Sequence, residues 1–303
     1  VGGEVDSEEI VELEECLREL YKKFGFDNET VDDNKQFTGL PASSYPTFSD
    51  FLEYLTENIK EMQNKEYNAM EQKIVGKTLL LRDKIRKVIR NIVKTYGNLF
   101  DGHTTIENIS DEQIITYNLS TIKELKPEVF DASIINMISL CWDNCVTNGK
   151  LMLKRLDEGS IKMWDVVRTL ILIDESHRWL NAKKLQALDL ISIYLREARK
   201  YFGGIGLASQ RAADYAPEGS QSEGINKLKD MFELTQYKFI FRQSSNAKKL
   251  LYSIFEGELT GNQINNIPKM GVGKCIMCIS GDRNIEFKVH LTKEEEKIFQ
   301  GGV

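Results

Sequence analysis

The segment that most constrains the fold of this chain is Thr169 to Glu175, TLILIDE, in which four consecutive apolar residues run into two adjacent carboxylates. Such a run is typical of a strand buried on both faces of a parallel sheet. In open α/β sheets, ligands bind beyond the carboxyl ends of the strands, where Asp174 and Glu175 would emerge. The segment therefore predicts either a ligand-binding acid pair or a buried strand that merely ends in two solvated acids.

Composition sets the outer limits. The 303 residues are 41% hydrophobic and 28% charged, which is ordinary for a globular protein of one large domain or two modest ones. With a net charge of −6, the surface of the chain as a whole is not suited to bind nucleic acid. No apolar run approaches a membrane span, and the first residues lack the form of a secretory signal. We expect a cytoplasmic protein.

The cysteines predict reduced thiols and no metal site. Their number, five, is odd, and no export signal accompanies them. Cys275 and Cys278 form a CxxC that lacks the second pair of ligands that a closed zinc site needs. The three histidines are scattered along the chain at His103, His177 and His290.

The first third of the chain predicts an all-α subdomain, residues 1–98. Capping boxes at Asp6 to Glu9 and at Thr47 to Asp50 each precede apolar residues at helical spacing. The first of these helices should end at Gly25. A long third helix is predicted from about Tyr67 to Tyr96, with Gly97 as its C-cap.

The third helix is basic. It allows two interpretations, a solvated or partner-facing surface and a DNA-binding surface, and the absence of interleaved aromatic residues favours the first. Gly76-Lys77-Thr78 within it resembles the end of a P-loop, but Glu71 stands where the first glycine is needed, so we expect a helix-interior glycine. Between Lys73 and Lys94, Asp83 is the single acid, and the cations are Lys73, Lys77, Arg82, Lys84, Arg86, Lys87, Arg90 and Lys94.

Residues 99–303 alternate between strand and helix patterns, which predicts an α/β core with a mostly parallel sheet and helices on both faces. The TLILIDE strand, a helix beginning near Asn181 and a strand from Ile205 to Ser209 form a right-handed βαβ unit. Before this unit come the following predicted elements: a strand at Ile114 to Leu119, a helix at 131–147 and a loop at 148–163.

Three features should then meet at one edge of the sheet: the acid pair, Gln210 after the second strand, and the helix end that carries Arg196 and Arg199. With LILIDESHRWL, LREARKYFGG and IGLASQR, the chain resembles the hexameric ATPases of the FtsK/HerA-like branch of the RecA fold. Within that branch it is most similar to the VirB-type ATPase of conjugative type IV secretion, the large, fourth VirB component. The similarity covers nearly the whole chain.

The resemblance implies ATP and Mg²⁺ as cofactors. Asp174 would hold Mg²⁺ through water, Glu175 would orient or deprotonate the attacking water, and Gln210 would sense the γ-phosphate. Arg199 is the first candidate for an arginine that reaches a neighbouring subunit's nucleotide, with Arg196 and Arg242 as alternates. The alternative roles are helix C-terminal cations for Arg196 and Arg199 and a strand-end cap for Gln210.

The family's P-loop is missing from these 303 residues. Gly271 to Cys275, GVGKC, is incomplete, because Pro268 replaces the first glycine and Cys275 replaces Ser or Thr, and its surroundings predict a hairpin turning at Gly281-Asp282. In the family the P-loop precedes the helical insert. We therefore expect the motif upstream of Val1, a gap in the sheet, and a fragment that binds ATP weakly without measurable hydrolysis.

The function implied is ATP hydrolysis that powers a conjugative secretion channel, by a hexamer at the inner face of the cell membrane, with other channel components as partners. One alternative is a DNA translocase or coupling protein of the same superfamily, whose ATPase DNA would stimulate in a salt-dependent way. Another is a non-catalytic scaffold that retains the acid pair as a relic.

Overall fold

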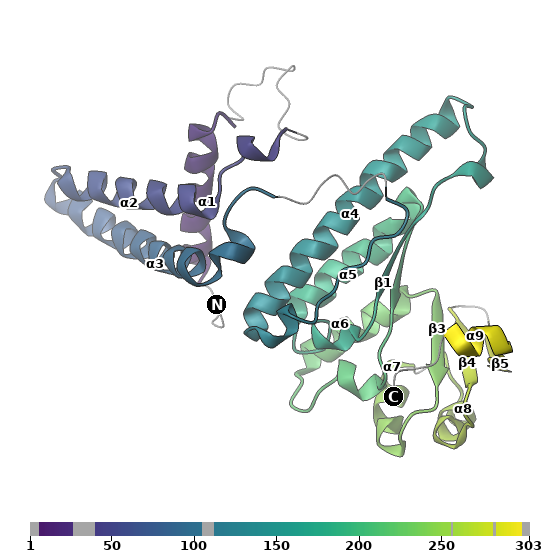
Figure 1. Ribbon diagram of the computed structural model, residues 1–303. Helices are drawn as coiled ribbons and strands as arrows, with labels where there is room; N and C mark the ends of the chain where they lie inside the picture. The colour runs from purple at the N-terminus through teal and green to yellow at the C-terminus, as the bar shows by residue number, and fades with distance from the viewer. Residues whose placement is uncertain (1–5, 27–39, 105–111, 256, 281–282, 299–303) are drawn as a thin grey trace. The chain divides into compact units, whose positions relative to one another are not determined.

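The computed structural model describes residues 6–26, 40–104, 112–255, 257–280 and 283–298. The chain divides into two compact units, residues 1–112 and 113–303, each with its own hydrophobic core. The first unit is helical, and the second alternates helices with strands (Figure 1). The predicted α/β class with a helical N-terminal part is confirmed. The domain boundary after residue 98 stays a prediction.

The helices of the first unit begin at side-chain caps. Thr47 accepts a hydrogen bond from the backbone N–H of Asp50, and the Asp50 carboxylate accepts one from the N–H of Thr47, so this predicted capping box is confirmed. Asn68 caps the next helix in the same way, whereas Asp6 makes no side-chain cap. The elements are α1 (Ser7–Lys23), a 3₁₀ turn (Ala42–Ser44), α2 (Phe48–Asn64) and α3 (Ala69–Phe100).

Helix α3 differs from its predicted end. It continues past Gly97 to Phe100, with a non-helical backbone at Tyr96 (φ −126°, ψ 18°). Gly97 does not adopt the left-handed conformation of a C-cap, because Asp101 closes the helix by donating its N–H to the Gly97 carbonyl at 2.8 Å. Gly25, in contrast, has φ +84° just after α1, as predicted.

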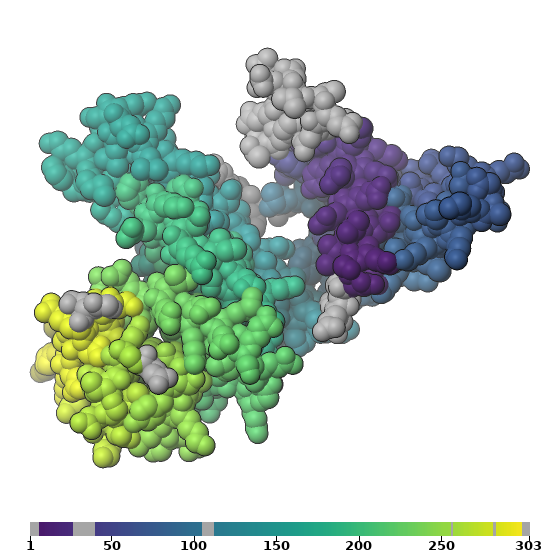
Figure 2. Space-filling model, turned by 180° about the vertical axis from the view of Figure 1, so that it is seen from behind, coloured from purple at the N-terminus to yellow at the C-terminus, as the bar shows by residue number. Residues whose placement is uncertain are grey.

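The second unit is built around two small sheets. In the space-filling view its green and yellow residues lie together in one packed body (Figure 2). Its helices are α4 (Pro127–Asp157), α5 (Leu185–Glu197), α6 (Ser222–Leu234), α7 (Lys248–Ile254), α8 (Gly261–Asn266) and α9 (Lys293–Ile298). Its strands are β1 (Thr169–Ile173), β2 (Gly203–Leu207), β3 (Tyr237–Phe241), β4 (Lys274–Ile279) and β5 (Arg283–Lys288).

Strands β1 and β2 pair in parallel, with Thr169 opposite Gly203 and Ile173 opposite Leu207. One face of the pair packs against the core formed with α4, α5 and α6. On the other face, Leu170 and Leu172 are 64% and 74% exposed. The prediction that this strand is buried on both faces is therefore wrong, because no described element covers the second face.

Strands β3, β4 and β5 form a separate antiparallel sheet. The predicted hairpin is confirmed as β4–β5, while its turn, Gly281-Asp282, lies outside the described residues. No ladder joins β2 to β3 in the described part of the chain. The interrupted sheet agrees with the gap that the sequence predicts. Among the described residues, no helix is long and apolar enough to cross a membrane.

Two other predictions in this unit fail. Residues 114–119 form no strand, and Ile114 is 87% exposed, because an apolar run becomes a strand only when a neighbour pairs with its backbone. The loop predicted from residue 148 is helical to Asp157. There Gly149 and Met152 are buried, so packing extends α4 through a segment whose polar residues are good helix formers.

Candidate functional site

The two acids form a sharp turn at the carboxyl end of β1. Glu175 has φ 48° and ψ 36°, a left-handed conformation that is uncommon for a residue other than glycine, and its N–H donates to Oδ1 of Asp174 at 2.9 Å. Such backbone conformations cost on the order of 1 kcal/mol and cluster at functional sites. The strand therefore ends in an ordered turn that holds both carboxylates at the edge of the sheet.

Buried Ser176 fixes this turn to the neighbouring strand. Its backbone N–H and its hydroxyl both donate to the Ala208 carbonyl, at 2.9 and 3.0 Å. The Tyr215 hydroxyl donates to the Ser176 Oγ at 2.6 Å, and burial raises the pKa of the Tyr215 phenol, which keeps the donor proton in place. The acids and the end of β2 thus form one rigid corner.

His177 lies between the acid pair and β2. Its Nδ1 is 3.4 Å from Oε2 of Glu175 and 3.0 Å from Oγ of Ser209. In the sequence this histidine is one of three scattered histidines. Its place two residues after the acid pair was the available signal.

Gln210 follows β2 at the same edge as the acids and is exposed. Its backbone carbonyl accepts a bond from Nε2 of Gln243 at 3.4 Å, and Oε1 of Gln243 accepts the N–H of Ala212 at 2.9 Å. Because Gln243 lies two residues after the end of β3, it holds the carboxyl end of β3 beside that of β2. Arg242 therefore also lies at this edge, and Gln243 is a site residue that the sequence did not predict.

Arg196 and Arg199 lie at the opposite edge. Arg196 is in the last turn of α5, and Arg199 is in the 3₁₀ segment Ala198–Tyr201, which leads directly into the start of β2. A strand of this length separates the two edges by roughly 16 Å. The prediction that these arginines share an edge with the acids is wrong, because a crossover helix runs antiparallel to its strands. A role toward a neighbouring subunit stays a prediction.

The acid pair suits a cation held through water. The described residues contain no group of three His, Cys, Asp or Glu side chains that could cage a metal. Asp174 has one oxygen engaged by Glu175, and among the described residues no protein donor meets the other. Mg²⁺ keeps several waters and needs only one or two carboxylates, so this donor set fits it. The cysteines are free, as predicted, and burial raises the pKa of the Cys278 thiol to about 11.

The basic surface of α3 is largely paired. Lys77 contacts Glu8 at 2.7 Å, and Lys84 pairs with Glu9. Buried Arg82 donates to Oε1 of Glu12 at 2.6 Å. All three acids belong to α1, so the partner of this basic helix is the acidic helix of its own unit.

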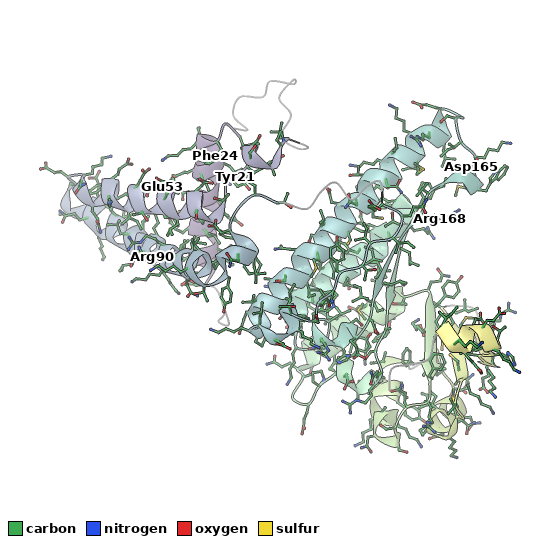
Figure 3. All side chains as sticks on the ribbon, in the orientation of Figure 1. Tyr21, Phe24, Glu53, Arg90, Asp165 and Arg168 are labelled. Atoms are coloured by element: carbon green, nitrogen blue, oxygen red, sulfur yellow. The ribbon has the colours of Figure 1, made fainter. Side chains whose placement is uncertain are left out.

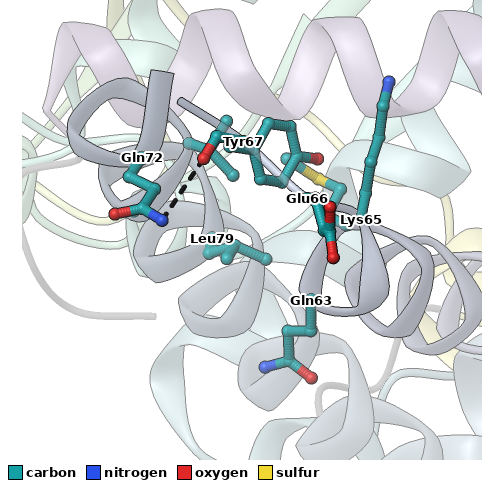
Figure 4. Close-up of a pocket in the computed structure, with 9 residues that line it drawn as sticks. Gln63, Lys65, Glu66, Tyr67, Gln72 and Leu79 are labelled. Atoms are coloured by element: carbon teal, nitrogen blue, oxygen red, sulfur yellow. Dashed lines mark hydrogen bonds between the residues drawn. The ribbon is translucent and has the colours of Figure 1, made fainter. Parts of the chain in front are cut away.

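The first unit also has a surface hollow of about 580 Å³ at the turn between α2 and α3 (Figure 4). Gln72 donates to the Tyr67 carbonyl at 3.3 Å in its wall. Gly76 lines it from inside α3, which confirms that this glycine belongs to a helix and not to a P-loop. None of the predicted site residues lines the hollow.

Comparisons with known proteins add the following. No family model matches the chain. The uncharacterized protein pXO2-09 of Bacillus anthracis is 27% identical over all 303 residues, and the chain spans about half (46%) of its length. The solved structure of VirB4 of Thermoanaerobacter pseudethanolicus superposes with a TM-score of 0.69 at 17% identity, covering 96% of this chain and 66% of that one. This chain therefore has the fold of VirB4, the protein family that its sequence resembles.

Proposed function

We propose that this chain is the part of a type IV secretion ATPase that activates water and holds the metal, and that a longer polypeptide supplies the part that grips the phosphates. The observation that carries this is the acid pair, Asp174 and Glu175, at the carboxyl end of β1 in a fold that matches VirB4. The whole protein would act as a hexamer at the cytoplasmic face of the membrane, with other channel components as partners.

Each residue then has a defined task. Bound Mg²⁺ would supply positive charge that offsets the charge developing on the transferred phosphate. Asp174 would hold this ion through water, and Glu175 would orient the attacking water and accept its proton. Gln210 contacts the γ-phosphate. The arginine that stabilises a neighbouring subunit's nucleotide is Arg199, with Arg196 and Arg242 as alternates.

The phosphate-gripping strand would fit between β2 and β3. Gln243 holds the carboxyl ends of these strands beside each other, yet no described strand pairs with both. Unpaired strand edges and exposed apolar side chains call for a covering segment. The exposed side chains on β1 and β3 are Leu170, Leu172, Tyr237, Phe239 and Phe241.

The test uses a longer protein that contains a strand followed by GxxxxGK[ST]. We expect Mg²⁺-dependent ATP hydrolysis that falls at least ~100-fold in Glu175→Gln, because general-base catalysis contributes about that much. Glu286→Gln, at an exposed position of β5, is the matched control and should keep full activity. The 303-residue chain alone should bind ATP weakly and show no turnover.

Two results would contradict the proposal. ATP hydrolysis that survives Glu175→Gln would show that Glu175 is not the catalytic base. An absence of hydrolysis by the longer protein would favour a non-catalytic scaffold. Strong stimulation by DNA that declines steeply with salt would instead favour a DNA translocase of the same superfamily.

A further inference from the structure

The corner beside the acid pair contains an imidazole that the proposed chemistry does not use. Nδ1 of His177 meets two oxygens from different strand ends, Oε2 of Glu175 at 3.4 Å and Oγ of Ser209 at 3.0 Å. Both partners of the first contact are partly enclosed, since 20% of the His177 side chain and 30% of the Glu175 side chain are exposed. The two contacts link the end of β1 to the residue just before Gln210.

The surrounding hydrogen bonds determine which atom carries the proton. The Ser209 hydroxyl donates to the carbonyl of Arg211 at 3.3 Å, since a carbonyl only accepts. Oγ is then an acceptor toward His177, and an ionised Glu175 carboxylate is also only an acceptor. Nδ1 therefore carries the hydrogen in this arrangement: it donates to Oγ of Ser209 at 3.0 Å, and Oε2 of Glu175 lies 3.4 Å from the same nitrogen.

The backbone of His177 is also held firmly. Its carbonyl accepts a hydrogen bond from Nδ2 of Asn181 at 2.9 Å, and the preceding residue, Ser176, is bonded to Ala208 through both its backbone and its side chain. The imidazole thus extends from a fixed turn toward Glu175. A side chain placed in this way can restrict the rotamers of the carboxylate that it contacts.

We propose that His177 is a positioning residue, which holds the Glu175 carboxylate in register with the end of β2 that bears Gln210. This inference rests on the proposed function, in which Glu175 accepts a proton from water. One carboxylate oxygen lies beside Nδ1–H at 3.4 Å, and the other is left to bind the water. The two groups that act on the nucleotide are then aligned by a single side chain.

The first test reads the tautomer directly in the 303-residue chain. In nitrogen NMR spectra recorded above the pH range in which histidine titrates, His177 should be the Nδ1–H tautomer, while exposed His290 should be the Nε2–H form. Ser209→Ala and Glu175→Gln should each shift His177 toward the Nε2–H form. A His177 that matches His290 in the wild-type chain would overturn the proposal.

The second test measures ATP hydrolysis by the longer protein. His177→Ala should lower kcat by roughly 10- to 100-fold with little change in KM, because a misplaced base affects the chemical step. His177→Asn, whose amide N–H can replace Nδ1–H, should restore most of the rate, and His290→Ala should change nothing. Equal rates of hydrolysis for the Ala and Asn variants would contradict the positioning role and leave His177 with a structural role alone.

The two tests separate the two proposals. If the wild-type longer protein does not hydrolyse ATP while His177 is the Nδ1–H tautomer, the proposed function fails and the positioning role fails with it, although the contact is supported. If hydrolysis depends on Glu175 and not on His177, only the positioning role is overturned.

Discussion

At the scale of single residues, the most enclosed charge among the described residues of the first unit is Arg82. It is 6% exposed, and it donates to Glu12 at 2.6 Å and to Oδ1 of Asn58 at 2.5 Å, with Glu19 at 3.5 Å. Carboxylates from α1 and an amide from α2 therefore converge on one guanidinium of α3. This network connects all three helices of the unit.

Replacing Arg82 should destabilise the first unit strongly. In Arg82→Met the carboxylate of Glu12, whose side chain is 12% exposed, loses its partner, and removal of one member of a buried ion pair costs about 3–5 kcal/mol. Arg90→Met is the matched control, because Arg90 is exposed on the same helix (Figure 3) and such changes usually stay within about 0.5 kcal/mol. Urea unfolding followed by helical circular dichroism measures both, and equal midpoints would contradict the buried network.

The thiol of Cys16 makes the same unit sensitive to alkaline pH. Burial raises its pKa from 9.0 to about 12, so the folded state keeps a proton that the unfolded state releases. The stabilising contribution is complete below the ordinary thiol pKa and is lost as the pH rises toward 12. The fall in unfolding free energy above the ordinary thiol pKa should be smaller in Cys16→Ala than in the wild type, and an identical pH profile would refute this.

Some residues of the candidate site could be predicted from the sequence, and others could not. Asp174 and Glu175 could be predicted because an apolar run ending in two acids is visible in one dimension. His177 could be suspected only from its place two residues after the acid pair, and Gln243 could not be predicted, because their roles depend on contacts with Ser209 and Gln210, which are more than 30 positions away. The edge at which Arg199 lies could have been predicted from the sequence, because a crossover helix runs antiparallel to the strands that it connects.

At the scale of elements, α4 depends on one glycine. A Cβ at Gly149 would lie 2.5 Å from the Cβ and 2.6 Å from the Cα of Tyr201, closer than carbon atoms can approach. The 3₁₀ segment before β2 can therefore pack on α4 only when position 149 has no side chain. This close approach positions the start of the strand that ends at Gln210.

Gly149→Ala should therefore destabilise the second unit by about 1–3 kcal/mol or more, since this is the usual cost of overpacking. Gly76→Ala in α3, where a Cβ meets nothing within 4 Å, should instead stabilise its helix by up to about 1 kcal/mol. Tryptophan fluorescence reports on the first variant, because all three tryptophans belong to the second unit, and helical circular dichroism reports on the second. A neutral Gly149→Ala would contradict the packing.

Elements were predicted best where local chemistry decides them. The Thr47–Asp50 box defines the start of α2 from four residues of sequence. The segment 114–119 has a strand-like pattern but no pairing partner, and α4 continues beyond 147 because its far end packs against other parts of the chain. Neither outcome can be obtained from periodicity alone.

At the scale of the whole molecule, the chain is two units with separate cores. The core of the first is built on Leu20, Phe51 and Leu55, and that of the second on Leu188, Leu228 and Ile276, among others. Each core is enclosed by residues of its own unit. This arrangement predicts two folding transitions rather than one.

Residues 1–112 expressed alone should be helical and should unfold cooperatively, since their buried contacts are internal. In the full chain, Arg82→Met should move only the transition seen by helical circular dichroism and leave the one seen by tryptophan fluorescence in place. Arg90→Met should move neither. A single shared transition that Arg82→Met shifts for both probes would show that the units are coupled.

The pairing of α1 with α3 also limits how strongly α3 can hold a polyanion. In the described part of the chain, Lys73, Arg90 and Lys94 are the cations of α3 without an ion pair. Three phosphate contacts release few counterions, and the slope of log affinity against log salt would be about −2.7. A fourfold rise in salt would then weaken such binding roughly 40-fold. Any steeper dependence in the whole protein must arise from cations elsewhere.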